Sequence, residues 1–353
     1  ANWNTAMGHN CLKSITTGYS NVAVGQAAGD AITTGYTNVA LGVEALGACS
    51  NGYNNVAIGA EALDALTGSA NNTAVGRSAL GANTTGTANN AIGAYALDAN
   101  TTGNYNAAFG NNALGVNTDG EQNAAFGNNA LDANTTGDYN TAFGASSLGA
   151  NTTANANTAI GFSALKLNTT GFENTAVGAY ALDACTTGQH NTAVGHNALT
   201  ASTTAQYNTA VGRNALATVS TGEYNTAIGM DALEHNTGNS NTACGTRALE
   251  ANTTGTQNQA LGYYALRNNT TGSYNNAFGY KVLEDNTTAS YNCAFGHECL
   301  KETTSGWGNT AMGFRAGQDI TTAWGCTFIG NDAGKNVTTA QDNTAIGHNT
   351  FTT

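Results

Sequence analysis

The side chains that recur most regularly along this chain and could take part in chemistry are amides. An asparagine returns at one fixed position of a short sequence repeat, and an amide both donates and accepts hydrogen bonds. One interpretation is a row of ligand-binding amides; the other is a ladder in which each asparagine bonds to the next and to turn backbone. We favour the ladder, because a binding site does not usually recur in every unit of a repeat protein. The expected members of the ladder include Asn21, Asn38, Asn55, Asn72, Asn140, Asn157, Asn174, Asn191, Asn208 and Asn225.

Tyrosines also share fixed positions of the repeat. Tyr95, Tyr180 and Tyr264 occupy one such position, and Tyr105 and Tyr139 belong to a second set. Exposed tyrosine rings can bind sugars, so the first three residues are candidate contacts for a glycan. The alternative, which we weigh more heavily, is that each ring packs over the neighbouring repeat.

Catalytic and metal-binding groups show no comparable organisation. Four histidines, among them His9 and His196, directly follow a glycine of the repeat. In a trimer each could form a ring of three imidazoles, but a solvated surface histidine is the simpler interpretation. The seven cysteines form no CxxC pair and occupy no equivalent positions in adjacent repeats, which indicates free thiols rather than a disulfide framework. We therefore predict a protein that is not an enzyme and needs no cofactor or metal.

A repeat that runs through the 353 residues must position these side chains. Its clearest marker is a glycine: Gly8, Gly25 and Gly42, the first three of these marker glycines, are 17 residues apart. The consensus is N-T-A-[VIF]-G-x-x-A-L-x-A-N-T-T-G-x-Y and it occurs 21 times. One step, from Gly229 to Gly245, has 16 residues. We expect the Thr-Thr-Gly corner to absorb the missing residue, with the strands on both sides still in register.

A unit of 17 residues has too little core to fold alone, so the units must stack. The length suits one coil of a parallel β-solenoid, and we predict an all-β fold with two short strands per coil. Asn-Thr-Ala-Val is the clearer strand, whereas x-A-L-x-A could be a strand or one helical turn. Both glycines of the repeat are expected at corners, where a positive φ or a close approach favours glycine. The whole range 1–353 is expected to be one continuous array, taken from a longer fibre.

The second corner also matches the N-glycosylation sequon Asn-Thr-Thr, for example at Asn83. We attribute this match to the repeat itself, unless the protein passes through a eukaryotic secretory pathway.

The composition narrows the choice of partners. Only 9% of the residues are charged, the formal net charge is −12, and the 10 Lys and Arg residues are scattered. Binding to nucleic acid and to an anionic membrane surface both depend on clustered basic side chains. No apolar stretch is long enough to span a bilayer, and no signal peptide is visible. We therefore expect no nucleic-acid partner and no membrane insertion.

Particular blocks of the repeat carry a resemblance to known families. Asn21–Gly25 (N-V-A-V-G) and Asn55–Gly59 (N-V-A-I-G) resemble the S-V-A-I-G head repeats of trimeric autotransporter adhesins. The longer unit at residues 174–182 resembles the repeat shafts of phage tail fibres. The resemblance covers essentially the whole chain and implies a left-handed parallel β-roll in a homotrimer, on a cell surface, on a virion or otherwise extracellular. The departures are a repeat longer than that of the adhesins and no recognisable coiled-coil stalk, membrane anchor or chaperone domain.

The function that these observations favour is a structural or adhesive fibre segment that presents a surface for a receptor or a glycan. A second argument favours the homotrimer. The alanine and leucine that recur at fixed positions of the repeat, such as Ala176 and Leu182, should form an apolar stripe on a single chain, and such a stripe usually marks an interface. The alternatives are a monomeric solenoid that binds ice or polysaccharide, and a subunit of an extracellular filament stacked end to end.

Overall fold

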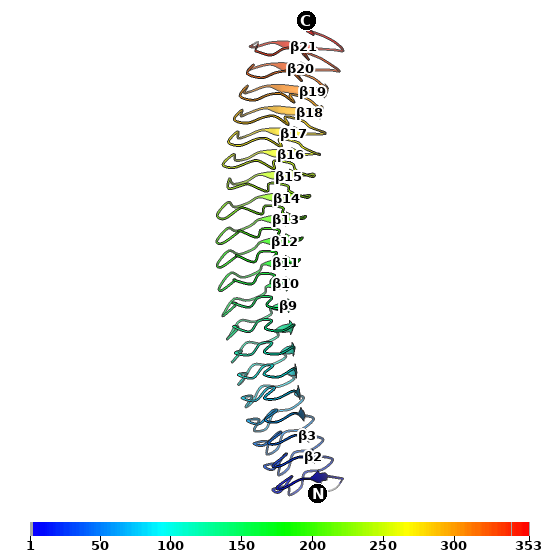
Figure 1. Cartoon of the computed structure of the whole chain (residues 1–353), viewed down its shortest axis with the longest axis vertical. Helices are drawn as coiled ribbons and strands as arrows, with labels where there is room; N and C mark the ends of the chain where they lie inside the picture. The colour runs from blue at the N-terminus through cyan, green and yellow to red at the C-terminus, as the bar shows by residue number, and fades with distance from the viewer. Residues whose placement is uncertain (1–2, 340, 353) are drawn as a thin grey trace. The chain divides into compact units, whose positions relative to one another are not determined.

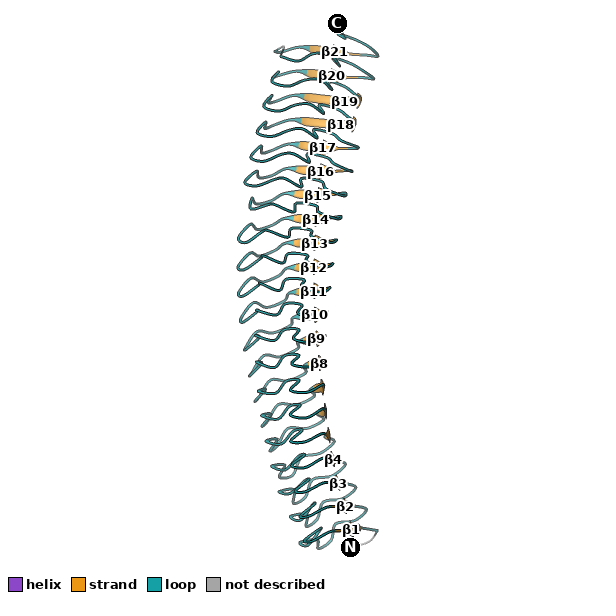
Figure 2. Cartoon of the chain, in the orientation of Figure 1, coloured by secondary structure: helices purple, strands orange, loops and turns teal. Residues whose placement is uncertain are grey.

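The structure is a computed structural model that describes residues 3–339 and 341–352. Its contacts divide the chain into two compact units, Ala1–Asn174 and Thr175–Thr353, and each unit is described by itself. In both, short parallel strands alternate with long stretches of turn and loop, and no helix occurs among the described residues (Figure 2). The all-β parallel solenoid expected from the repeat is confirmed.

Each coil contributes one strand, and within each unit the coils follow one another in chain order (Figure 1). The strands of the first unit are β1 (Thr5–Met7), β2 (Val22–Val24), β3 (Val39–Leu41), β4 (Val56–Ile58), β5 (Thr73–Val75), β6 (Asn90–Ile92), β7 (Ala107–Phe109), β8 (Ala124–Phe126), β9 (Thr141–Phe143) and β10 (Thr158–Ile160). Those of the second are β11 (Thr175–Val177), β12 (Thr192–Val194), β13 (Thr209–Val211), β14 (Thr226–Ile228), β15 (Thr242–Cys244), β16 (Gln259–Leu261), β17 (Asn276–Phe278), β18 (Cys293–His297), β19 (Thr310–Phe314), β20 (Thr327–Ile329) and β21 (Thr344–Ile346).

Neighbouring strands within a unit pair in register, so equivalent residues of successive repeats lie side by side. In β12 and β13, for example, Ala193 is opposite Ala210. The register also survives the shortened repeat, since Ala227 of β14 is opposite Ala243 of β15. The prediction that the Thr-Thr-Gly corner absorbs the missing residue is therefore confirmed.

The core of each coil is narrow and is filled by the chain itself. The second residue of each strand from β2 to β21 points inward, and Ala193 and Leu199 of one coil are both fully buried. The same holds for nearly every member of the alanine and leucine columns. An apolar stripe formed by these two columns was therefore a wrong expectation, because the neighbouring coils already cover both.

The second segment of the repeat is neither a strand nor a helical turn, so the expectation of two strands per coil was wrong. Its leucine has a left-handed backbone: the φ of Leu182 is 52°. The Leu182 N–H donates to the Ala198 carbonyl of the next coil at 3.0 Å. A left-handed leucine costs on the order of 1–3 kcal/mol, and the fold holds it there by this bond and by complete burial of the side chain.

The marker glycine behaves as expected at a corner. Gly195 has a φ of 136°, and a Cβ there would lie 2.5 Å from the Gly212 carbonyl oxygen of the next coil. Only glycine satisfies both the backbone angle and the close approach.

The glycine of Thr-Thr-Gly is different, and the left-handed turn proposed for it was wrong. Gly188 lies outside the left-handed region, and Ala205 and Ala154 fill the equivalent place in other coils. Close contact with the next coil, rather than a positive φ, favours glycine at this second corner.

Candidate functional site

The asparagine column lies inside the coils. Asn38 is 1% exposed, its Nδ2 donates to the Gly52 carbonyl at 2.8 Å, and its N–H donates to Asn21 Oδ1 at 3.0 Å. Asn38 Oδ1 in turn accepts from the backbone N–H of Asn55 at 3.1 Å. The amides are thus occupied within the chain and connect each coil to the next. Buried side chains with comparable bonds in this column belong to Asn21, Asn38, Asn55, Asn72, Asn140, Asn157, Asn174, Asn191, Asn208 and Asn225.

A second asparagine ladder was missed in the sequence. Asn117 Nδ2 donates to Asn100 Oδ1 at 2.9 Å and to the Gly120 carbonyl at 3.0 Å. The residues of this ladder are those of the Asn-Thr-Thr segments, and Asn83, a match to the glycosylation sequon, is fully buried. One signal could have revealed the ladder: other repeats place Ile32 or another apolar residue at the same position, as a buried site requires.

Of the three tyrosines predicted to contact a glycan, the two in the second unit are not brought together. Tyr95 belongs to the first unit and is 37% exposed, with Arg77 Cζ 5.7 Å from its ring centroid. Tyr180 and Tyr264 belong to the second unit and lie five coils apart, which at about 4.8 Å per coil is about 24 Å. They are separate surface positions and do not form one site.

Tyr264 lies in a cluster of cations. Arg267 Cζ is 4.5 Å from its ring centroid, Lys281 Nζ is 5.8 Å from it, and Arg247 donates to its hydroxyl at 3.4 Å. A hydrogen bond with Tyr263, together with the neighbouring arginines, lowers the pKa of Tyr264. The three cations also lie 2.8–3.5 Å from carboxylate oxygens, so the cluster is charge-paired. Pairing leaves it poorly suited to bind a free anion.

The other set of tyrosines forms the tyrosine column. We define this column as the residue directly before each asparagine of the first ladder, as Tyr224 stands before Asn225. Its members stand out from the surface, as Tyr224 (58% exposed) and Tyr291 (62%) show. Where two occur in succession their rings stack, with centroids 5.1 Å apart for Tyr207 and Tyr224. The column is therefore an exposed aromatic ridge wherever consecutive repeats keep the tyrosine.

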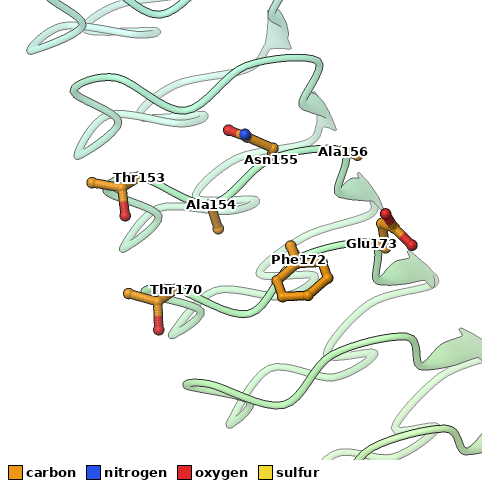
Figure 3. Close-up of a pocket in the computed structure, with 7 residues that line it drawn as sticks. All are labelled: Thr153, Ala154, Asn155, Ala156, Thr170, Phe172 and Glu173. Atoms are coloured by element: carbon orange, nitrogen blue, oxygen red, sulfur yellow. The ribbon is translucent and has the colours of Figure 1, made fainter.

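The ridge is interrupted by a hollow in the first unit. Ala156 and Glu173 take the tyrosine position in two successive coils, and a recess of about 340 Å³ opens there (Figure 3). Phe172 and Asn155 also line it. Asn155 Oδ1 accepts from the backbone N–H of Asp138 at 2.8 Å, so part of its polar capacity is used within the chain.

A second recess, of about 370 Å³, lies in the second unit between the tyrosine column and the first residues of the strands. It crosses the coils of β15, β16 and β17. Its walls are neutral: hydroxyls, side-chain amides and one tyrosine ring. The lining residues are Ser240, Thr242, Gln257, Gln259, Tyr274 and Asn276.

Within residues 3–339 and 341–352 no three His, Cys, Asp or Glu side chains lie close enough to hold a metal ion. The histidines that follow the marker glycines lie on the surface; His9 and His297, for example, are exposed. No helix in the described part of the chain is long and apolar enough to cross a membrane.

The thiols fall into two classes, and we expect their reactivity to differ sharply. Burial raises the pKa of Cys185 to about 11, whereas Cys244 and Cys293 are exposed on the strands. Since only the thiolate attacks, two pKa units lower the reactive fraction at neutral pH by about 100-fold, before access is considered. Titration with a chromogenic disulfide should show fast equivalents that Cys244→Ser and Cys293→Ser each reduce by one. Equally fast labelling of Cys185 would contradict this.

The chain matches no protein-family model and no curated protein.

Proposed function

We propose that the chain is a structural and adhesive fibre segment that works outside the cell, on a cell surface or on a virion. In this proposal three copies pack side by side as left-handed β-rolls, and their surface presents a site for a receptor or a glycan. The solenoid supports this role because, within both units, hydrogen bonds connect each coil to the next, as a shaft under tension requires.

One observation carries the proposal, and it concerns the residue directly before each marker glycine. This outer apolar column points away from the core and is apolar in every coil, yet the alternation of the strand leaves it open to solvent. In the first unit Ile92 is 41% and Phe143 57% exposed, and Phe109 and Phe126 stack with centroids 4.7 Å apart. A surface position with no structural need for apolar residues would be expected to vary.

The size of this surface suits association. Ten strands of the first unit each contribute one half-exposed apolar side chain. Five of these side chains are 36–65% exposed and the other five are less exposed, so at about 150–200 Å² per side chain the column leaves on the order of 500–700 Å² open. A standard interface buries about 800 Å² on each partner. Because the copies are identical, a closed symmetric assembly covers every stripe at once, and the adhesin resemblance favours three chains.

The test is the mass of the chain in solution. We expect sedimentation equilibrium to give three chain masses, and Phe126→Lys to weaken association by at least about tenfold, because it places charges within a closed apolar contact. The matched control is Asn128→Lys, an exposed residue of the same coil that lies outside the column.

A single chain mass for the unaltered protein would contradict the trimer. It would favour the alternative, a monomeric solenoid that binds ice or polysaccharide directly, to which the burial of the alanine and leucine columns within one chain already lends support. Masses that grow with concentration without limit would instead favour the end-to-end filament.

A further inference from the structure

We infer that the recess across β15, β16 and β17 is a binding groove for a linear, neutral glycan. The inference rests on the proposed function, whose receptor surface it locates and whose ligand class it names. The groove shares β15, β16 and β17 with the outer apolar column, whose residues in those strands are Cys244, Leu261 and Phe278. The two proposals are therefore told apart by measuring the mass and the glycan binding of the same samples.

The first reason is the chemistry of the walls. The groove of about 370 Å³ is lined by Gln257, Gln259 and Asn276 together with two hydroxyl residues and Tyr274. No ionisable carboxylate, amine or guanidinium is among the lining residues. An amide offers donors and an acceptor in one plane, and this matches sugar hydroxyls, which are donors and acceptors themselves. A few placed polar groups beside an aromatic wall are typical of a small-molecule site.

The second reason is that these amides are available. Among the described residues no hydrogen bond reaches the side chains of Gln257, Gln259 or Asn276, although their backbone N–H groups are all bonded to carbonyls. Gln257 and Gln259 are exposed and Asn276 is half-buried. By contrast, the side-chain amides of the two asparagine ladders already form hydrogen bonds within the chain. A ligand that bonds the groove amides would thus compete with water only.

The third reason is a local departure from the repeat. In the second unit the first residue of each strand from β11 to β15 is threonine, and threonine returns from β19 to β21. Between them stand Gln259, Asn276 and Cys293. Threonine is the better strand former and asparagine is depleted in strands, so folding alone does not explain the change. Gln259 and Asn276 line the recess, and Cys293 follows them in the next coil.

The shape of the groove favours a linear ligand. Equivalent side chains of successive coils repeat at about 4.8 Å along the solenoid, and the rings of Tyr274 and Tyr291 follow this spacing with centroids 4.9 Å apart. One pyranose ring is about as long as one coil is high, so an extended chain of sugars can present each ring to one coil. Two recesses of the first unit lack this row. In one, Glu173 introduces a carboxyl group and Asn155 already bonds the backbone; in the other, alanines stand at the strand positions, at Ala107 and Ala124.

The test is titration calorimetry of the full chain with cellohexaose, laminarihexaose and maltohexaose, and with an acidic hexagalacturonate. We expect at least one neutral hexasaccharide to bind, with an affinity that hardly changes with salt because no charge is involved. Gln259→Thr and Asn276→Thr restore the usual residue of the column, so the fold is kept. Each should weaken binding by about 2- to 10-fold, the effect of one lost hydrogen bond.

The matched control is Asn90→Thr, the same change at the same strand position in the first unit. It should leave binding unchanged. Three results would overturn the inference: no neutral hexasaccharide binds, the two groove variants bind as the unaltered chain does, or only the acidic sugar binds in a salt-dependent way. Sedimentation of the same samples keeps the two proposals apart, since glycan binding by a monomer would reject the trimer alone, and a trimer without binding would reject the groove alone.

Discussion

Replacing Gly195 with alanine should lower the free energy of unfolding by about 2–6 kcal/mol. Two costs add at this position. The backbone φ of 136° is one that a residue with a Cβ rarely adopts, which costs about 1–3 kcal/mol. The new methyl group would also lie 2.5 Å from the Gly212 carbonyl oxygen, so neighbouring coils must separate locally at a further cost of about 1–3 kcal/mol. Urea unfolding followed by circular dichroism measures the change.

The control for this substitution is Gly188→Ala at the other corner of the preceding coil. Alanine already occupies the equivalent place at Ala154 and Ala205, and the backbone there is not left-handed. A Cβ at Gly188 would still lie 2.4 Å from the Ala205 carbonyl oxygen, so we expect a loss of about 1–3 kcal/mol from crowding alone, smaller than the loss at Gly195. Equal losses for the two variants would mean that crowding alone, and not the backbone angle, requires the marker glycine.

Replacing Asn208 with alanine should cost about 2–4 kcal/mol. Its Nδ2 donates to the Gly222 carbonyl at 2.8 Å, and its Oδ1 accepts from the backbone N–H of Asn225 at 2.9 Å. Alanine removes these two bonds and a third, which Asn208 Oδ1 accepts from Asn225 Nδ2 at 3.2 Å. It leaves two buried backbone groups without a partner, each at about 1–3 kcal/mol. The same urea unfolding measures the loss.

Asn331→Ala provides the comparison, because Asn331 is exposed and outside both ladders. Its free energy of unfolding should change by less than about 0.5 kcal/mol. If Asn208→Ala changed the free energy of unfolding as little as Asn331→Ala, the asparagine ladder would not contribute to the stability of the coils.

Much of the fold could be predicted from the sequence, because stacking places repeated residues in a repeated environment. The period of the marker glycine predicted the coil, and the Asn-Thr-Ala-Val block predicted the strand that the structure has, for example in β12. The shortened repeat was assigned to the correct corner because the block around Ala243 is intact while the corner has lost a residue. Each of these conclusions needed only the spacing of residues along the chain.

The candidate site was harder to predict, because the surface is assembled from residues of different coils. Tyr95, Tyr180 and Tyr264 share a position of the repeat, yet sharing a position does not make residues neighbours unless their coils adjoin. The groove at Gln257, Gln259 and Asn276 combines two positions over adjoining coils. The sequence signalled this groove only by the replacement of threonine at the first residue of the strand. That replacement points to a surface site only once the structure shows that this residue faces outward.

The sequence by itself determined the period, the strand and the glycine corner, since these follow from local residue types and their spacing. Only the tertiary structure decided which way each side chain points. Leu182 turns fully inward on a left-handed backbone that leucine does not favour locally, because a hydrogen bond to the next coil and burial of its side chain outweigh that preference. The apolar residue before each marker glycine turns outward because it follows the buried alanine on the strand, and successive strand residues point to opposite faces. The narrow core holds the small alanine and has no room for the larger side chain.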